Sequence, residues 1–235
     1  MKRTVVAGGR RIEYTLIQSS RANVLFQAVP QAIRVYAPKY MGLRAVDDLV
    51  RQRAGQLLEM RRSVEARLEA DRRAHPVTEG SPIMIEGTRC ALRLHKGARR
   101  TGKLMGEEYH LTLPEPDSDP AVRAAIRSTL SARALARIRE RLDHFVPRIG
   151  RAPGRVTIRE QKSRWGSCSQ KGNLNFNWKL IMAPPEVLDY VVVHELCHLY
   201  EFNHSPRFWS LVEAQLPDYL VWKKWLKAHR EDLYL

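Results

Sequence analysis

Cysteine is scarce in this chain, which has only Cys90, Cys168 and Cys197 among its 235 residues. An odd and scattered set of three is too small for the disulfide framework of a small secreted domain. Long apolar runs are missing as well, since no stretch approaches the roughly 18 uncharged apolar residues of a transmembrane helix. The apolar run near the N-terminus is too short for a secretory signal. We therefore expect a cytoplasmic protein with no membrane partner.

Acidic residues are in the minority. The chain has 25 Asp and Glu against 40 Lys and Arg, a net charge of +15 and a sequence pI of about 10.2. Residues 1–150 carry +12 of this charge and residues 151–235 carry +3. Such an asymmetry indicates either an anionic partner such as nucleic acid or a solvated surface of interleaved charges. The hydrophobic share of 44% excludes a disordered chain.

The first 150 residues predict a basic β/α scaffold. Runs of β-branched and aromatic residues bounded by prolines indicate short antiparallel strands, at 12–18, 24–29 and 32–37. Apolar residues at helical spacing predict two long helices, at 43–74 and 121–146. Further strands are expected between these helices, at 82–95 and 109–113.

The last third predicts a core that carries the chemistry. Strands are expected at 155–160 and 173–183, followed by helices at 185–201, 206–215 and 218–229. Strands and helices in separate blocks indicate an α+β fold. We divide the chain into an N-terminal scaffold region, 1–150, and a core, 151–235, and expect them to form one continuous structural unit.

The predicted helix at 185–201 contains the sequence HELCH, with His194 and His198 four residues apart. Residues at this spacing lie on one face of a helix, so both imidazoles can bind one Zn²⁺. Glu195 lies beside the metal without being a ligand, where it can take a proton from a zinc-bound water and return it to a leaving amine. This is the H-E-x-x-H arrangement of zinc peptidases.

A third ligand is expected downstream of the helix. His204 follows His198 by six residues, and a chain that turns back after the helix can complete a three-histidine site with an open fourth position. Cys197, Glu201 and Glu213 are alternative ligands. We favour His204, and we interpret Cys197 as a small buried side chain behind the site.

The segment from RWGSC at 164–168 through HELCHLYEFNHSPRFW to LPDYLVWKKWL closely resembles the YgjP-like metallopeptidase family of zincin-fold proteins. The resemblance is strongest over 160–226 and extends to nearly the whole chain. It implies a zincin-like catalytic core with an active-site helix. It also implies a zinc metallopeptidase, with His194, His198 and His204 as zinc ligands and Glu195 as the catalytic glutamate.

Other zinc peptidases are less similar. Metzincins share the histidine spacing but carry Gly where this chain has Glu201, and they have a downstream methionine turn, whereas no Met follows Met182. The resemblance to SprT-like and WLM-type proteases, some of which act on proteins crosslinked to DNA, is distant and is an analogy.

Protein or peptide substrates are expected to bind beside the strand that precedes the active-site helix. If this strand, 173–182, is an edge strand, an extended peptide can pair with its backbone, which makes Asn175, Asn177 and Arg164 candidate substrate-binding residues. The alternative is an ordinary sheet strand whose asparagines face solvent.

The basic charge of the N-terminal region indicates a second possible function. The loop with Arg99, Arg100 and Lys103 is compatible with a nucleic-acid-associated protein whose zinc site is structural or vestigial, or with a protease recruited to DNA. This loop has no interleaved aromatic residues for base stacking. The metallopeptidase is therefore the preferred hypothesis.

Overall fold

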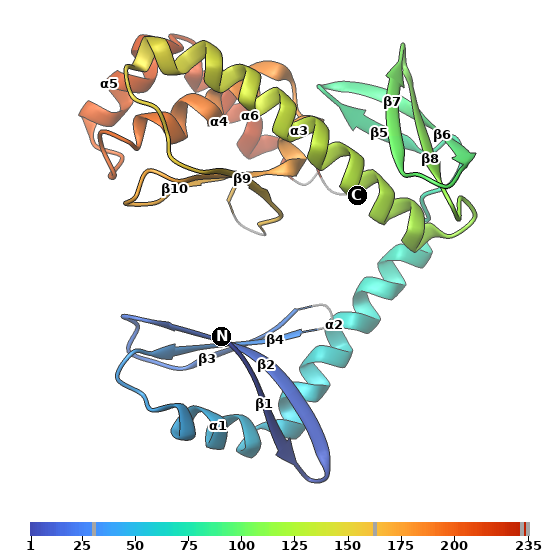
Figure 1. Ribbon diagram of the computed structural model, residues 1–235, viewed down its shortest axis with the longest axis vertical. Coiled ribbons are helices and arrows are strands. Elements are labelled where there is room, and N and C mark those ends of the chain that lie inside the picture. The colour runs from blue at the N-terminus through green and yellow to red at the C-terminus, as the bar shows by residue number, and fades with distance from the viewer. Residues whose placement is uncertain (30–31, 162–163, 231–232, 234–235) are drawn as a thin grey trace. The chain divides into compact units, whose positions relative to one another are not determined.

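A computed structural model of the chain describes residues 1–29, 32–161, 164–230 and 233, with the side chains of 71 and 72 left aside. The chain forms two compact units, Met1–Pro76 and Val77–Leu235, and each is described by itself (Figure 1). The expected division at residue 150 falls inside the second unit, at the end of its longest helix.

The first unit contains a four-stranded sheet in the order β1-β2-β4-β3. Its strands are β1 (Lys2–Ala7), β2 (Arg10–Ser19), β3 (Leu25–Val29) and β4 (Ala32–Pro38). The pair β3–β4 is antiparallel, as expected, and so is β1–β2, although the sequence did not predict β1, but β2–β4 is parallel. The sheet is mixed because β3 and β4 form a hairpin, which returns β4 to the direction of β2.

Two helices, α1 (Leu43–Gln52) and α2 (Ala54–Ala74), follow this sheet. The sequence predicted a single helix at 43–74, but the chain leaves helical geometry at Arg53, whose φ is −100°. Asp47 on α1 is bound by Arg3 on β1, with Nε to Oδ1 at 3.0 Å, and by the Tyr14 hydroxyl on β2 at 2.5 Å. These bonds tie α1 to the sheet beside a small apolar core.

The second unit begins with another four-stranded sheet in the order β5-β6-β8-β7. Its strands are β5 (Pro82–Ile85), β6 (Thr88–Lys96), β7 (Thr101–Met105) and β8 (Glu108–Leu113). The long helix α3 (Asp119–Ile149) packs against β7 and β8. It continues through Pro147, where the sequence placed its end, and stops at Gly150, whose φ of +81° is left-handed.

A three-stranded sheet in the order β10-β11-β9 precedes the helix that contains the HELCH sequence. It consists of β9 (Val156–Arg159), β10 (Gly166–Cys168) and β11 (Leu174–Asn177). The expected strand at 173–183 is shorter because the Asn177 side chain accepts a hydrogen bond from the Lys179 backbone N–H, and a 3₁₀ helix, η1 (Trp178–Met182), starts there. The prediction that this strand is an edge strand is wrong, since β11 lies between β10 and β9.

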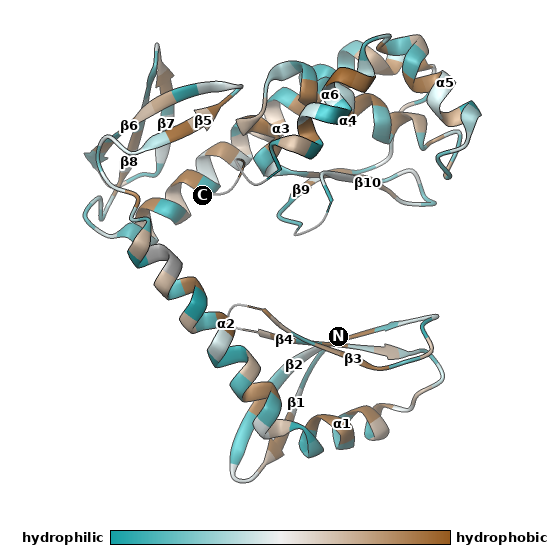
Figure 2. Ribbon diagram, turned by 180° about the vertical axis from the view of Figure 1, so that it is seen from behind, coloured by the Kyte–Doolittle hydropathy of each residue, from teal (hydrophilic) through white to brown (hydrophobic). Residues whose placement is uncertain are grey.

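Three helices complete the unit: α4 (Pro185–Cys197), α5 (Pro206–Gln215) and α6 (Tyr219–Ala228). Helix α4 contacts α3, α5, α6 and β10, so it lies at the centre of the unit. Figure 2 shows hydrophobic and hydrophilic residues alternating along the helices. Among the described residues, no helix is long and apolar enough to cross a membrane. The predicted α+β fold class is confirmed.

Candidate metal centre

Helix α4 positions His194 and Glu195 in its last turn. Pro185 opens the helix, and most of its side chains are buried aliphatic residues that fix its rotation about its axis. His198 is the C-cap residue and keeps helical dihedral angles, with φ −65° and ψ −12°. The i, i+4 geometry that the sequence predicted therefore holds through His198.

The segment after α4 returns the chain to the helix and brings His204 with it. The Tyr200 hydroxyl donates to the Ile149 carbonyl at 2.9 Å, and Arg151 donates to the Leu199 carbonyl. Ser205 caps α5 by accepting from the Phe208 N–H at 3.3 Å. These bonds hold both ends of the segment, so the position of His204 does not depend on a bound ligand alone.

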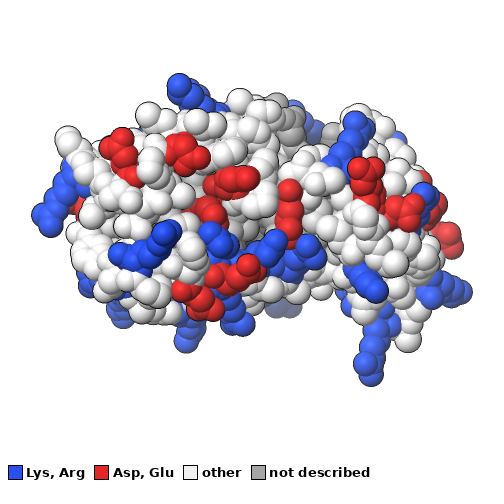
Figure 3. Space-filling model, turned by 90° about the horizontal axis from the view of Figure 1, so that it is seen from above, with Lys and Arg blue, Asp and Glu red and all other residues white. Residues whose placement is uncertain are grey.

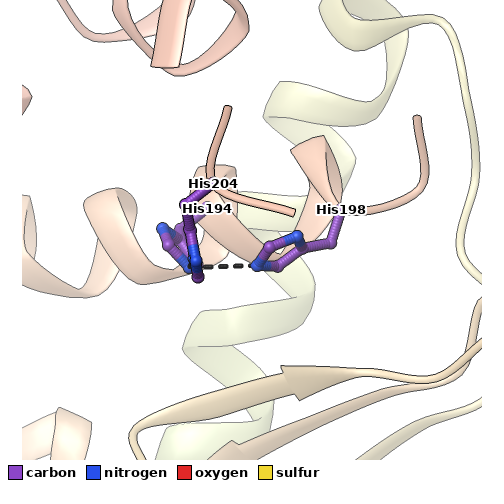
Figure 4. A group of neighbouring side chains, drawn as sticks. All are labelled: His194, His198 and His204. Carbon is purple, nitrogen blue, oxygen red and sulfur yellow. Dashed lines mark hydrogen bonds between the residues drawn. The ribbon is translucent and has the colours of Figure 1, made fainter. Parts of the chain in front are cut away.

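Three imidazoles converge at this point, as Figure 4 shows. The Nε2 atom of His194 lies 3.2 Å from Nε2 of His198 and 3.1 Å from Nε2 of His204. Four ligands placed tetrahedrally at 2.0–2.1 Å from one zinc ion lie about 3.3–3.4 Å apart. The observed spacings are close to this value, and these histidines are the one group among the described residues with the proximity that a metal site needs.

The hydrogen bond at the other nitrogen of His198 prepares Nε2 for a metal. Nδ1 of His198 lies 2.9 Å from the backbone carbonyl oxygen of Glu201, which can only accept. The proton is therefore on Nδ1, and Nε2 presents a lone pair to the centre. A neutral His194 has one ring proton and cannot satisfy both neighbouring Nε2 atoms, so a cation fits this centre better than hydrogen bonds do.

Aromatic rings pack behind the ligands. His198 stacks on Phe208, with ring centroids 4.5 Å apart, and His204 stacks on Trp209 at 5.5 Å. Both aromatics belong to α5, and Trp209 packs against the core that contains Phe208. Phe208 is fully buried, but the two rings also set the orientation of the imidazoles, which their spacing in sequence did not reveal.

The environment keeps His194 and His204 neutral, which is the form that binds metal. Burial, together with the positive charges that His198, His204 and Lys223 can carry, lowers the pKa of His194 to about 3. Burial also lowers the pKa of His204, with contributions from His198 and Lys223. Protons therefore compete weakly with a metal at these two positions.

Glu195 is 4% exposed and next to the histidines. Its Oε2 atom has no hydrogen-bond partner among the described residues. Burial raises its pKa to about 8, against the opposing effect of the positive charge on Arg164. A buried acidic group without a partner for one oxygen is costly for the fold, so packing does not account for a glutamate at this position.

The edge strand β10 packs directly on Glu195. A Cβ atom built on Gly166 would lie 2.4 Å from Oε1, 2.6 Å from Cγ and 2.7 Å from Cδ of this glutamate. Only glycine leaves room for the carboxylate here. This contact could not be predicted from the sequence, because Gly166 and Glu195 are 29 positions apart.

If the chain is the peptidase that its sequence predicts, Gly166→Ala is expected to displace the Glu195 carboxyl group and to lower kcat by roughly 100-fold, the typical effect of a misplacement of about 1 Å. Zinc content should stay unchanged because no ligand is touched. Steady-state peptide hydrolysis and metal analysis measure the two effects. Gly55→Ala is the matched control, since its Cβ would meet nothing within 4 Å. Full activity in Gly166→Ala would contradict this role.

The candidate substrate-binding residues have different surroundings. Asn177 is 3% exposed, and its amide donates to the backbone carbonyls of Gln161 and Arg164 at 2.9 and 3.4 Å. Asn175 is hydrogen-bonded to Thr157 on β9. Both amides thus serve the fold, whereas the exposed Arg164 lies close enough to Glu195 to affect it electrostatically.

The alternative metal ligands do not join the three histidines. Cys197 is 1% exposed, and burial raises the pKa of its thiol to about 12, so it stays a protonated buried side chain. Glu213 is exposed on α5. Glu201 contributes its backbone carbonyl to His198, an indirect role that sequence spacing could not distinguish from ligation.

The family model described as YgjP-like, metallopeptidase domain, matches residues 22–229. The metallopeptidase zymogen of Pyrococcus abyssi abylysin is 29% identical over 32% of this chain and 76% of its own, with a TM-score of 0.31. The zymogen of Methanocaldococcus jannaschii jannalysin is 20% identical over 40% of this chain and 95% of its own, with a TM-score of 0.35.

No curated protein matches this chain. The family assignment rests on the match over 22–229, which includes all three histidines and Glu195. The chain belongs to the YgjP-like metallopeptidase family.

Proposed function

We propose that this protein is a zinc-dependent metallopeptidase that hydrolyses peptide bonds in proteins or peptides. His194, His198 and His204 hold the metal, and Glu195 is the general base and then the general acid. The convergence of three Nε2 atoms beside a buried glutamate is the observation that supports this proposal most strongly.

The residues have separate tasks in this reaction. The three neutral histidines would hold a zinc ion without reducing its charge, and the ion would supply the Lewis acidity that acidifies water and polarises the scissile carbonyl. A carboxylate oxygen of Glu195 accepts the proton of the attacking water. The same oxygen then donates this proton to the leaving amine nitrogen, which balances the hydrolysis without a covalent intermediate.

Strand β10 is the proposed place for the substrate backbone. It is the outer strand of its sheet, paired with β11 on one side only among the described strands. Gly166 at its start lies against Glu195, so a peptide that pairs with the free edge of β10 passes close to the general base. We therefore assign to β10 the role that the sequence analysis gave to residues 173–182.

The experiment that tests this proposal is hydrolysis of a diverse peptide library by the protein before metal removal, after removal with a chelator, and after return of zinc. We expect cleavage that disappears with the metal and returns with it. Cleavage that survives verified metal removal would contradict the proposal.

Nucleic acid as a partner stays a prediction. Figure 3 shows Lys and Arg interspersed with Asp and Glu on the face that it displays. Several arginines of α3 are paired with carboxylates: Arg133 and Arg137 with Glu86, and Arg141 with Asp189. Of the three basic residues of the expected loop, the structure places only Arg99 and Arg100 outside regular structure, whereas Lys103 lies on strand β7. All three side chains are exposed and have no such pairs with described residues, and the prediction rests on them.

A further inference from the structure

Lys223 on α6 lies over the ring of Trp209, next to the metal centre. Its Nζ atom is 3.7 Å from the centroid of the Trp209 ring. Trp209 in turn stacks on His204, with centroids 5.5 Å apart and planes 21° apart, and on Tyr219 at 5.4 Å and 14°. The cation–π contact holds a flexible side chain in one place, and that place adjoins a metal ligand.

The ammonium of Lys223 adjoins the metal centre through Trp209, which stacks on His204, and no neighbouring carboxylate in the described part of the chain neutralises its charge. No carboxylate of the described residues lies within ion-pair distance of Lys223, and the side chain is exposed. It therefore differs from Arg133, Arg137 and Arg141 of the same unit, whose charges are already paired.

We propose that Lys223 binds a carboxylate of the substrate close to the scissile bond, so that the peptidase prefers peptides that carry a negative charge there. This inference rests on the proposed peptidase function. A carboxylate is the anion that peptides supply, either as an Asp or Glu side chain or as a free C-terminus. Lys223 is a specificity residue in this account, because it takes no part in proton transfer.

Such a charge pair changes affinity by a limited amount. An ammonium on a partly exposed surface contributes about two- to tenfold in binding, between an exposed ion pair and a charge-assisted hydrogen bond. The contact is present before and during the reaction, so it should change KM and leave kcat nearly constant. This KM effect separates specificity from a structural role, which would change kcat or stability for all substrates alike.

The test uses one cleaved peptide from the library in four forms. Two forms carry Glu or Gln next to the scissile bond within a longer peptide. The other two end shortly after that bond, with a free or an amidated C-terminus. We expect the wild-type protein to favour at least one charged form over its neutral partner by about two- to tenfold in kcat/KM. The pair that shows the preference identifies the source of the carboxylate.

Three variants test whether Lys223 causes the preference for the charged peptide. Lys223→Gln should remove the preference by raising KM for the charged form, and Lys223→Arg should keep it. Lys224→Gln, the neighbouring exposed lysine on α6 with the same change in net charge, should behave like wild type. Equal losses for charged and neutral peptides in Lys223→Gln, or an unchanged preference, would overturn the proposal.

Binding without turnover separates this inference from the proposed function. Calorimetry of the four peptides with zinc-loaded Glu195→Gln, with and without Lys223→Gln, measures the charge preference when no bond is cleaved. Hydrolysis without any charge preference would reject the role of Lys223 and leave the peptidase intact. If the wild-type protein cleaves no peptide, the proposed function fails. If calorimetry also shows no preference for the charged peptides, the role of Lys223 is rejected independently of that failure.

Discussion

Glu195→Gln is expected to abolish peptide hydrolysis while zinc stays bound. The amide keeps the shape of the side chain in a site that is 4% exposed, but it cannot accept the proton of the attacking water. General acid–base catalysis typically contributes about 10²–10⁴-fold, so kcat should fall by at least about 100-fold. Steady-state kinetics on a cleaved library peptide, with metal analysis of the same sample, measure both quantities.

The fold should tolerate this change. Oε2 of Glu195 has no hydrogen-bond partner among the described residues, and the substitution removes a carboxylate that is costly to bury. Thermal unfolding should therefore occur at the same temperature or higher. Glu186→Gln, in the exposed first turn of the same helix, is the control and should retain activity. Substantial hydrolysis by Glu195→Gln would mean that another group is the base.

His204→Ala is expected to remove most of the zinc. Loss of a partner that only hydrogen-bonds a ligand costs 10–100-fold in metal affinity, so loss of a ligand itself should cost more than about 100-fold. His204 is exposed and lies outside α4, and its removal should disturb the fold less than removal of His194 or His198. Competition with a chromophoric chelator measures the affinity, and elemental analysis measures the zinc content per chain.

The control for this prediction is Glu201→Gln. Glu201 contributes a backbone carbonyl to His198, and the substitution leaves that carbonyl in place, so zinc should be retained. If Glu201→Gln loses zinc and His204→Ala keeps it, the third ligand is the carboxylate that the sequence analysis considered as an alternative.

The sequence was sufficient to predict the metal site because its main parts are local. One helical turn determines the relative positions of His194, Glu195 and His198, and buried aliphatic residues specify the helix. His204 follows within the next ten residues, where the cap at Ser205 limits the path of the chain. The resemblance to a known family over the same segment agreed with this interpretation, and the family match confirmed the family.

Contacts between distant segments could not be predicted in this way. The packing of Gly166 on Glu195 and the position of Lys223 on Trp209 join residues that are 29 and 14 apart in the sequence. The order of a sheet is set by pairing across its strands, so the alternating pattern at 173–177 identified a strand but did not show that β11 is central. The helix break at Arg53 also lacked a strong signal, since Gly55 is tolerated inside α2.

The central claim is that peptide hydrolysis requires zinc bound by the three histidines. Titration of the metal-free protein with zinc tests this claim most directly. Peptide hydrolysis should rise in proportion to added zinc and stop rising at about one zinc per chain, the number expected for a mononuclear catalytic site. The His204→Ala protein should show no such rise at the same zinc concentrations. Hydrolysis by the metal-free wild-type protein, or a rise that is equal in the variant, would contradict the account.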